Sequence, residues 1–231
     1  MTSARLPLPR ATSCTDLAIN IQLLVSQYGR VNLDETVFRA LNQAGSNLAL
    51  DAVMVSLAIL GMTYVLVFAG PVLWWRKHRE LGFDVVVLII ISDVVVESLK
   101  LLFMRERPGA VLEDVSTLSW GFFTTATSMS FPSGHTSRAF ATAVLIAFGT
   151  RYSVGASVLA FAVMVGLCRL YLGLHWPSDV LVGALLGVVL AIIMRWIGKR
   201  DNAYTRTRAR FIKWLRGLDR SGRTGTRGQS S

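Results

Sequence analysis

The stretch from Ala52 to Trp74 holds 23 residues without a charge, and this feature limits what the chain can fold into more than any other. An α-helix needs about 20 consecutive apolar residues to cross the hydrocarbon core of a bilayer. Only 16% of all residues are charged and 52% are hydrophobic, whereas an ordinary soluble domain has about 25% charged residues. The sequence therefore predicts an integral membrane protein rather than a soluble globular enzyme.

Five apolar runs predict an all-α fold, a one-domain membrane helical bundle with spans at approximately 48–75, 81–103, 132–151, 152–172 and 177–197. A sixth span is an alternative. The predicted organisation is an N-terminal segment over 1–46, a transmembrane domain over 47–198 and a basic tail over 199–231. The N-terminal segment lacks the continuous apolar core of a signal peptide, so we expect no cleavage. Its short amphipathic pieces predict interfacial helices on the outer face, with the apolar residues Leu17, Ile21, Leu24, Val37 and Leu41.

The net charge of +10 belongs mainly to the tail, because the chain from Arg195 onward carries 11 Lys and Arg residues against two Asp residues. Basic residues also follow the first span and separate the third from the fourth, at Arg76, Lys77, Arg79 and Arg151. Basic loops of membrane proteins stay in the cytoplasm. We therefore expect a cytoplasmic tail, with the second-to-third and fourth-to-fifth connections facing outward. The same topology predicts Trp176 in the outer aromatic belt.

Within the tail, apolar residues at helical spacing predict a helix that lies on anionic lipid headgroups, and this membrane partner is favoured over nucleic acid. The apolar residues are Phe211, Leu215 and Leu218, with Arg208, Lys213 and Arg216 around them. The last dozen residues are expected to be disordered, because their composition cannot form a core.

Lys100 and Arg107 form the first of three polar groups near the predicted outer ends of the spans. Seven residues make two helical turns, so both cations are expected on one face of the second span, about 10 Å apart. Pro108 is expected to end that helix. An ordinary fringe of basic residues at a helix end would have the same appearance.

The second group is the sequence Phe131-Pro132-Ser133-Gly134-His135, which directly precedes an apolar run. Proline is favoured at the first position of a helix, so the N–H groups of Ser133 and Gly134 are expected to point out of the helix start. A helix N-terminus attracts anions, and glycine allows an oxyanion to approach the backbone. This predicts a phosphate site beside His135, although a capped helix with an incidental histidine is the simpler alternative.

The third group contains Arg169, His175 and Asp179. Pro177 predicts a helix start, so Asp179 falls in the first turn and its carboxylate can reach back toward His175. Such a contact would fix the tautomer of the imidazole and support a positive charge on it, and a neutral histidine held in this way is a nucleophile. Taken alone, an acidic residue at a helix start beside an interfacial histidine would also explain the pattern.

All three groups fall on the predicted outer face, although that topology was assigned from other residues. Three cations, two histidines and one carboxylate at one membrane depth are poorly explained by chance. In these motifs the sequence resembles the type-2 phosphatidic acid phosphatase family, whose signature reads KxxxxxxRP, PSGH and SRxxxxxHxxxD. The corresponding segments are Lys100 to Pro108, Pro132 to His135 and Cys168 to Asp179. Cys168 departs from the usual serine, which affects one supporting hydrogen bond because a thiol is a weak donor.

The resemblance implies a phosphatase that needs no metal or other cofactor. His175 would attack phosphorus and form a phosphohistidine, Asp179 would orient it, and His135 would protonate the leaving group. The three equatorial phosphoryl oxygens would be held by Lys100, Arg107, Ser133, Gly134 and Arg169. From the residues alone, neither a carboxylate cluster nor a His/Cys cluster could seat Mg²⁺ or Zn²⁺.

Other polar residues are expected to have structural roles. Asp93 and Glu97 share a helix face with Lys100 and favour a buried interhelical network. Arg105 could add to the phosphate field or face solvent, and the loop over 111–129 could cover the site. Cys14 and Cys168 form no disulfide framework.

The expected substrate is a lipid phosphate or diphosphate, with a polyprenyl diphosphate favoured by resemblance to small phosphatases of the family. Phosphatidate or phosphatidylglycerol phosphate is the second choice. A vanadate-dependent oxidoreductase is a further alternative, because vanadium haloperoxidases are similar in the same motifs. A non-enzymatic scaffold or channel is the remaining one. The oligomeric state is left open.

Overall fold

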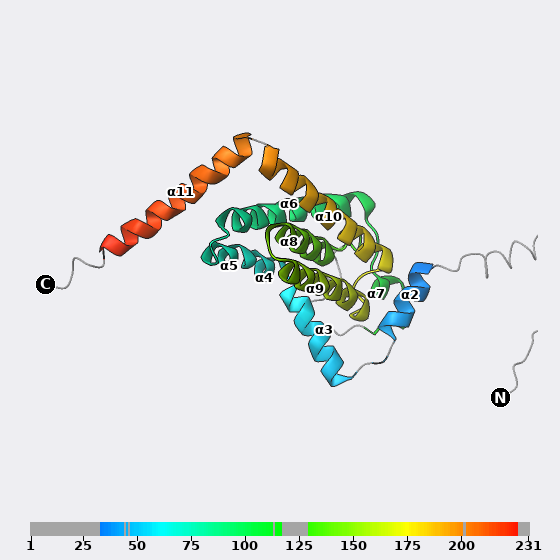
Figure 1. Ribbon diagram of the computed structural model, residues 1–231. Helices are drawn as coiled ribbons and strands as arrows, with labels where there is room; N and C mark the ends of the chain where they lie inside the picture. Colours follow the sequence, from blue (N-terminus) through cyan, green and yellow to red (C-terminus); the bar gives the residue numbers. More distant parts are fainter. Residues whose placement is uncertain are drawn as a thin grey trace, which may run out of the picture.

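The computed structural model describes residues 33–43, 45, 47–112, 114–116, 129–200 and 202–225, with side chains described up to residue 217. Within these ranges all regular elements are helices (Figure 1). They are α2 (Leu33–Asn42), α3 (Leu48–Leu60), α4 (Thr63–Val67), α5 (Ala69–Trp75), α6 (Arg79–Phe103), α7 (Pro108–Val111), α8 (Gly134–Gly149), α9 (Tyr152–Tyr171), α10 (Pro177–Arg200) and α11 (Asn202–Gly225).

Helix α8 is the centre of the bundle and packs against α6, α9 and α10. Its buried face is rich in small residues, including Ala139, Ala141 and Ala143. Glycines on α10 allow the two backbones to approach closely, since a Cβ atom on Gly183 would lie 2.6 Å from the carbonyl oxygen of Ser133. Small residues commonly make such close helix contacts in membrane proteins. The close packing brings the N-terminal ends of α8 and α10 together.

Two of the described helices, α9 and α10, are long and apolar enough to cross a membrane, and the bent pair formed by α3 with α4 and α5 would make a third. Helix α6 has 25 residues, about 37 Å at 1.5 Å per residue, but it carries six charged side chains. Helix α8 has only 16 residues. The all-helical prediction is confirmed for the described residues, whereas the count of five spans remains a prediction.

The first predicted span is not one straight helix. Its two halves meet at Gly61 and Met62 with a bend of 60°. Gly61 packs so closely against α9 that a Cβ atom there would lie 2.8 Å from a Val165 methyl group.

The end of α6 differs from the prediction that Lys100 and Arg107 share one helix face. The helix ends at Phe103, and Met104 adopts a left-handed conformation with φ of 44°. Arg107 is extended, as expected for a residue that precedes proline. The expected continuation of this helix to Arg107 is therefore wrong, and Arg107 lies on a connection between α6 and α7.

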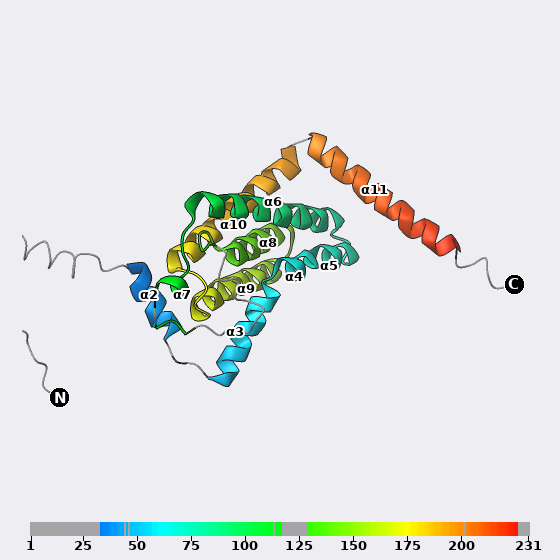
Figure 2. The same ribbon diagram turned by 180° about the vertical axis from the view of Figure 1, so that it is seen from behind.

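The two terminal parts of the described chain lie at opposite ends of the bundle (Figures 1 and 2). Helix α2 corresponds to the second predicted N-terminal helix, whereas the piece from Leu17 to Leu24 lies outside the described residues. Helix α11 confirms a helix in the tail and continues to Gly225, so the prediction of disorder from about residue 220 is wrong up to that point.

Candidate active site

The candidate site lies where α6 ends and α8 and α10 begin, the end of the bundle that also carries α2 and α7 (Figure 1). His175 lies on the short connection between α9 and α10 and is 3% exposed. Its Nδ1 atom lies 2.8 Å from the backbone oxygen of Ser130 and 3.6 Å from Oδ2 of Asp179. Because Nδ1 donates to the Ser130 carbonyl, Nε2 remains as the nitrogen with a free lone pair.

Asp179 lies in the first turn of α10, which confirms the predicted helix start at Pro177. Its side chain accepts hydrogen bonds from the Trp176 N–H at 2.9 Å and from the Ser130 hydroxyl. It also accepts from Nη1 of Arg105 at 2.7 Å. The predicted carboxylate–imidazole proximity is present at 3.6 Å, but the tautomer is fixed by a backbone carbonyl and the carboxylate supports the imidazole from greater distance.

Burial lowers the pKa of His175 to about 4, because the desolvated ring disfavours the charged form more strongly than Asp179 favours it. Arg107 and Arg169 lower this pKa further. The ring is therefore neutral at physiological pH, which is the state that a nucleophilic histidine requires.

Arg169 is the most fully enclosed cation of the site, with 2% of its surface exposed near the end of α9. Its Nε and Nη2 atoms find no hydrogen-bond partner in the part of the chain that the structure describes. A buried guanidinium without a partner is unfavourable unless an anion arrives. This arrangement suits a phosphoryl oxygen, since two N–H groups of a guanidinium can bind two oxygens side by side.

His135 lies one residue inside the start of α8, and its Nε2 atom is buried and likewise unpartnered among the described residues. The charged groups of Arg169, Arg138 and Lys100 are near enough to act electrostatically on the ring. His135 and His175 also act on each other in this way. The sequence-based placement of both histidines in one site therefore agrees with the geometry.

The start of α8 differs in detail from the prediction, because Ser133 is the N-cap and the helix begins at Gly134 rather than at Pro132. The N–H of Ser133 donates to the backbone oxygen of Asp179 at 3.0 Å, so it joins α8 to α10 and is not free for phosphate. The buried Ser133 hydroxyl lies 3.0 Å from that of Thr136. The N–H of Gly134 belongs to the first turn, where backbone donors have no intrahelical partner.

The two cations of the first motif approach the site differently. Nη1 of Arg107 donates to the backbone oxygen of Leu174 at 3.2 Å, directly beside His175. Burial lowers the pKa of Arg107, and the charge of Arg169 lowers it further. Lys100 forms an ion pair with Glu97 at 2.8 Å within α6, and its part in holding phosphate stays a prediction.

Four contributors were missed or left open by the sequence. Arg105 binds Asp34 of α2 at 2.6 Å as well as Asp179, so it clamps α2 to α10 although its side chain is 33% exposed. Asp34 also accepts from the Ser178 N–H at 2.7 Å. Ser130 orients His175. Arg138 of α8 is 7% exposed and pairs with Asp93 of α6, which gives the interhelical part of the predicted network.

Arg138 lies directly over the phosphate-site turn, since a Cβ atom on Gly134 would lie 3.0 Å from its Nη1 atom. The signal for Arg138 was available, because a charged residue four positions inside a span needs a partner or a function. Trp176, by contrast, was wrongly placed in an aromatic belt. It is 6% exposed, and its indole N–H donates to the backbone oxygen of Glu106 at 2.9 Å.

Cys168, where the phosphatase signature has serine, is fully buried and donates to the backbone oxygen of Val165 in its own helix. Its sulfur also interacts with the neighbouring Arg169. In the described ranges, no three His, Cys, Asp or Glu side chains are grouped closely enough to hold a metal ion.

A family comparison matches residues 81–203 to the PAP2 superfamily. The chain is 30% identical to the bacitracin transport permease protein BcrC of Bacillus licheniformis, over 73% of this chain and 81% of that protein. It is 31% identical to the putative undecaprenyl-diphosphatase YbjG of Escherichia coli, over 59% of this chain and 69% of that protein. Among solved structures, LpxE of Aquifex aeolicus has a TM-score of 0.64 and 34% identity, covering 70% of this chain and 94% of that one.

These findings, together with the apolar helices, show that the chain is an integral membrane protein of the PAP2 superfamily. Its enzyme class is that of the phosphatases that hydrolyse lipid phosphates.

Proposed function

We propose that this PAP2 superfamily member hydrolyses a polyprenyl diphosphate to the polyprenyl phosphate and inorganic phosphate, through a phosphohistidine on His175. The observation that carries the proposal is the buried guanidinium of Arg169, whose Nε and Nη2 atoms are unpartnered within the described chain. It lies close enough to act on the charge of both histidines.

The phosphoryl group binds where these groups converge. Arg169 and Arg107 hold its equatorial oxygens, with the Gly134 N–H at the start of α8 and the Ser133 side chain beside it. Lys100 contributes through its charge while it stays paired with Glu97. These cations supply the positive charge that stabilises the transition state.

Nε2 of His175 attacks phosphorus, and the bond from phosphorus to the bridging oxygen breaks. The electron pair of that bond leaves with the lipid phosphate. As the imidazole becomes positively charged, Nδ1 keeps its hydrogen bond to the Ser130 carbonyl and Asp179 stabilises the charge from 3.6 Å.

His135 donates a proton to the leaving oxygen and then accepts one from water. That water attacks the phosphohistidine, which releases inorganic phosphate and restores neutral His175. The unpartnered Nε2 atom of His135 supports this assignment, because a buried ring nitrogen without a protein partner is available to the substrate.

The substrate class is supported by the relative named undecaprenyl-diphosphatase. A membrane site at the end of the bundle reaches a headgroup while the lipid tail remains in the bilayer. We also propose that this end faces away from the cytoplasm, since basic residues gather at the other end. A cysteine is placed at the exposed Asp114 in a variant from which Cys14 and Cys168 have been removed. In intact cells this cysteine should react with an impermeant thiol reagent. Reaction only after permeabilisation would reverse the orientation.

The decisive experiment measures phosphate release by the purified chain in detergent with EDTA present, from polyprenyl diphosphate, phosphatidate and phosphatidylglycerol phosphate. We expect the highest kcat/KM with the diphosphate. A clear preference for either monoester would replace the proposed substrate, and activity that requires added Mg²⁺ would contradict the mechanism.

A further inference from the structure

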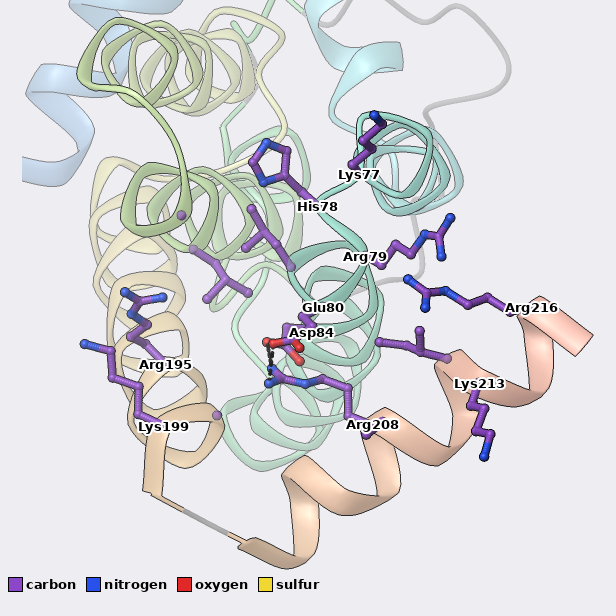
Figure 3. Close-up of a pocket in the computed structure, with 16 residues that line it drawn as sticks. Lys77, His78, Arg79, Glu80, Asp84, Arg195, Lys199, Arg208, Lys213 and Arg216 are labelled. Carbon is purple, nitrogen blue, oxygen red and sulfur yellow. Dashed lines mark hydrogen bonds and ion pairs between the residues drawn. The ribbon is translucent and has the colours of Figure 1, made fainter.

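A cavity of about 760 Å³, drawn in Figure 3, lies between α6 and α11, at the opposite end of the bundle from α2 and α7 (Figure 1). Its walls come from the turn before α6, the first turns of α6, the end of α8, the last turns of α10 and the middle of α11. Ligand sites in proteins commonly enclose about 300–1,000 Å³. The cavity plays no part in the proposed reaction, because α6 separates it from Lys100 by about five helical turns.

The lining of this cavity is strongly basic, with seven Lys and Arg side chains against Glu80 and Asp84. Both carboxylates are already bound by Arg208, at 2.7 and 2.6 Å. The other six cations have no carboxylate partner among the described residues, and they are Lys77, Arg79, Arg195, Lys199, Lys213 and Arg216. Like charges around one space repel each other, so an anion bound there relieves an unfavourable interaction.

The wall formed by α11 is fixed to the bundle rather than loosely apposed. Arg208 is 9% exposed and reaches from α11 to Asp84 on α6, as Figure 3 shows. The hydroxyl of Tyr204 donates to the same carboxylate at 2.6 Å. The rings of Phe211 and Phe83 lie 5.3 Å apart and close the contact. Arg208 was expected on the lipid-facing side of the tail helix, and the structure instead makes it the residue that joins this helix to the bundle.

The cavity also has apolar walls, contributed by Leu81, Leu145 and Ile212. A small inorganic anion would use only the cations and leave these walls unfilled. A phospholipid supplies both components, because its phosphate meets the basic groups and its glycerol and proximal acyl carbons meet the apolar ones. Trp196 follows the cavity residue Arg195 on α10 and is 57% exposed. Tryptophan at a helix end is typical of the membrane interface.

We propose that this cavity is a binding site for an anionic phospholipid of the cytoplasmic leaflet, which seats its phosphate among the cations of α6, α10 and α11. Basic pockets between membrane helices on the cytoplasmic side bind lipid headgroups in the same way. The site goes beyond the proposed reaction and does not depend on it, and its assignment to the cytoplasmic leaflet rests on the proposed orientation. The bound lipid stabilises α11 against the bundle.

The test compares two triple variants of the full-length chain with equal change in charge. The cavity variant carries Arg79→Gln, Lys199→Gln and Arg216→Gln, which removes one cation from each of α6, α10 and α11. The matched control carries Arg76→Gln, Arg151→Gln and Arg210→Gln, which are exposed and do not line the cavity. Binding in neutral detergent is measured for short-chain phosphatidylglycerol, short-chain phosphatidylcholine and glycerol 1-phosphate.

We expect phosphatidylglycerol to bind the cavity variant about tenfold more weakly than the wild type and the control, with the neutral-headgroup lipid and glycerol 1-phosphate bound weakly by all three. If the triple variant fails to fold, Lys199→Gln alone should weaken binding about threefold. Equal loss in both triple variants would reduce the cavity to diffuse surface charge. Equal affinity for glycerol 1-phosphate would make it a site for a soluble phosphate. Phosphate release measured on the same samples keeps this result separate from the reaction.

Discussion

Both ends of the bundle bury an arginine, but the two arginines have opposite surroundings. At one end Arg169 is 2% exposed, and two of its nitrogens are unpartnered within the described chain. At the other end Arg208 is 9% exposed and bound to two carboxylates. Burying a charge is unfavourable unless it is paired. A paired arginine therefore fixes one helix to another, whereas an unpaired one keeps a place for an anionic substrate.

The same comparison applies to the carboxylate of each end. Asp84 is bound by Arg208. Asp179 is bound by Arg105, and its charge also acts on Arg107 and His175. Arg105 holds this carboxylate in place beside His175, where it can stabilise a positive charge on the imidazole. Both ends pair an aspartate with an arginine. One pair supports the candidate site, and the other joins α11 to α6.

The largest effect is expected from His175→Ala, which removes the nucleophile. Phosphate release should fall by at least about 10⁴-fold, since removing a nucleophile eliminates the covalent route. Covalent capture of radiolabelled phosphate should disappear with it. His78→Ala is the matched control at the other end of the bundle and should leave turnover unchanged. Turnover by His175→Ala above one percent of the wild type would exclude the phosphohistidine.

Arg169→Met tests the unpaired arginine directly. We expect kcat/KM to fall by about 10²–10³-fold, the range found when one transition-state hydrogen-bond donor is removed. The unfolding temperature should not fall, because methionine fills similar volume and removes an uncompensated buried charge. A variant that loses stability but retains activity would show that Arg169 has a structural partner and not a substrate.

His135→Ala separates two kinds of leaving group. A monoester expels an alkoxide whose conjugate acid has a pKa of about 16, comparable to water, and needs a general acid. A diphosphate expels a lipid phosphate whose second pKa is about 6 and can leave without one. Phosphatidate hydrolysis should therefore lose about 10²-fold more activity than polyprenyl diphosphate hydrolysis. Equal losses would mean that His135 mainly binds the phosphoryl group.

Arg208→Met completes the comparison and should have the smallest effect on turnover, less than about twofold. It should instead lower the free energy of unfolding by roughly 2–3 kcal/mol, because the buried Asp84 loses its charged partner. For a chain of this size that corresponds to a drop of roughly 4–12 °C in unfolding temperature. Arg169→Met should lower activity and keep stability, whereas Arg208→Met should lower stability and keep activity. A large loss of turnover in Arg208→Met would contradict this distinction between the two ends.

The sequence could predict the parts of this site that depend on short spacings. Pro177 begins α10, so the proximity of Asp179 to His175 follows from a separation of four residues. The prediction failed where a helix end depended on a single backbone conformation, because nothing in the apolar pattern marks Met104 as left-handed. It also left the role of Arg105 open and missed Arg138, and the partners of both lie on other helices. Such contacts depend on packing and not on local pattern.

The fold shows the same division. The helical character of the apolar runs was predictable from composition, whereas the 60° bend near Gly61 depends on the approach of Val165 from α9. The number of spans stays a prediction, because α6 carries six charged side chains and does not qualify as a span by its composition.

The hydrogen bond from Ser178 to Asp34 joins residues 144 positions apart. It can therefore form only late in the synthesis of the chain. Asp34 leaves the ribosome first, and at about 5–20 residues per second its partner follows roughly 10 s later. During that interval Arg105 has neither Ser178 nor Asp179 to hold, and His175, the proposed nucleophile, is made only near the end of it. A partly synthesised chain thus carries no working phosphatase, and activity begins only when the last span has entered the bundle and the clamp has closed.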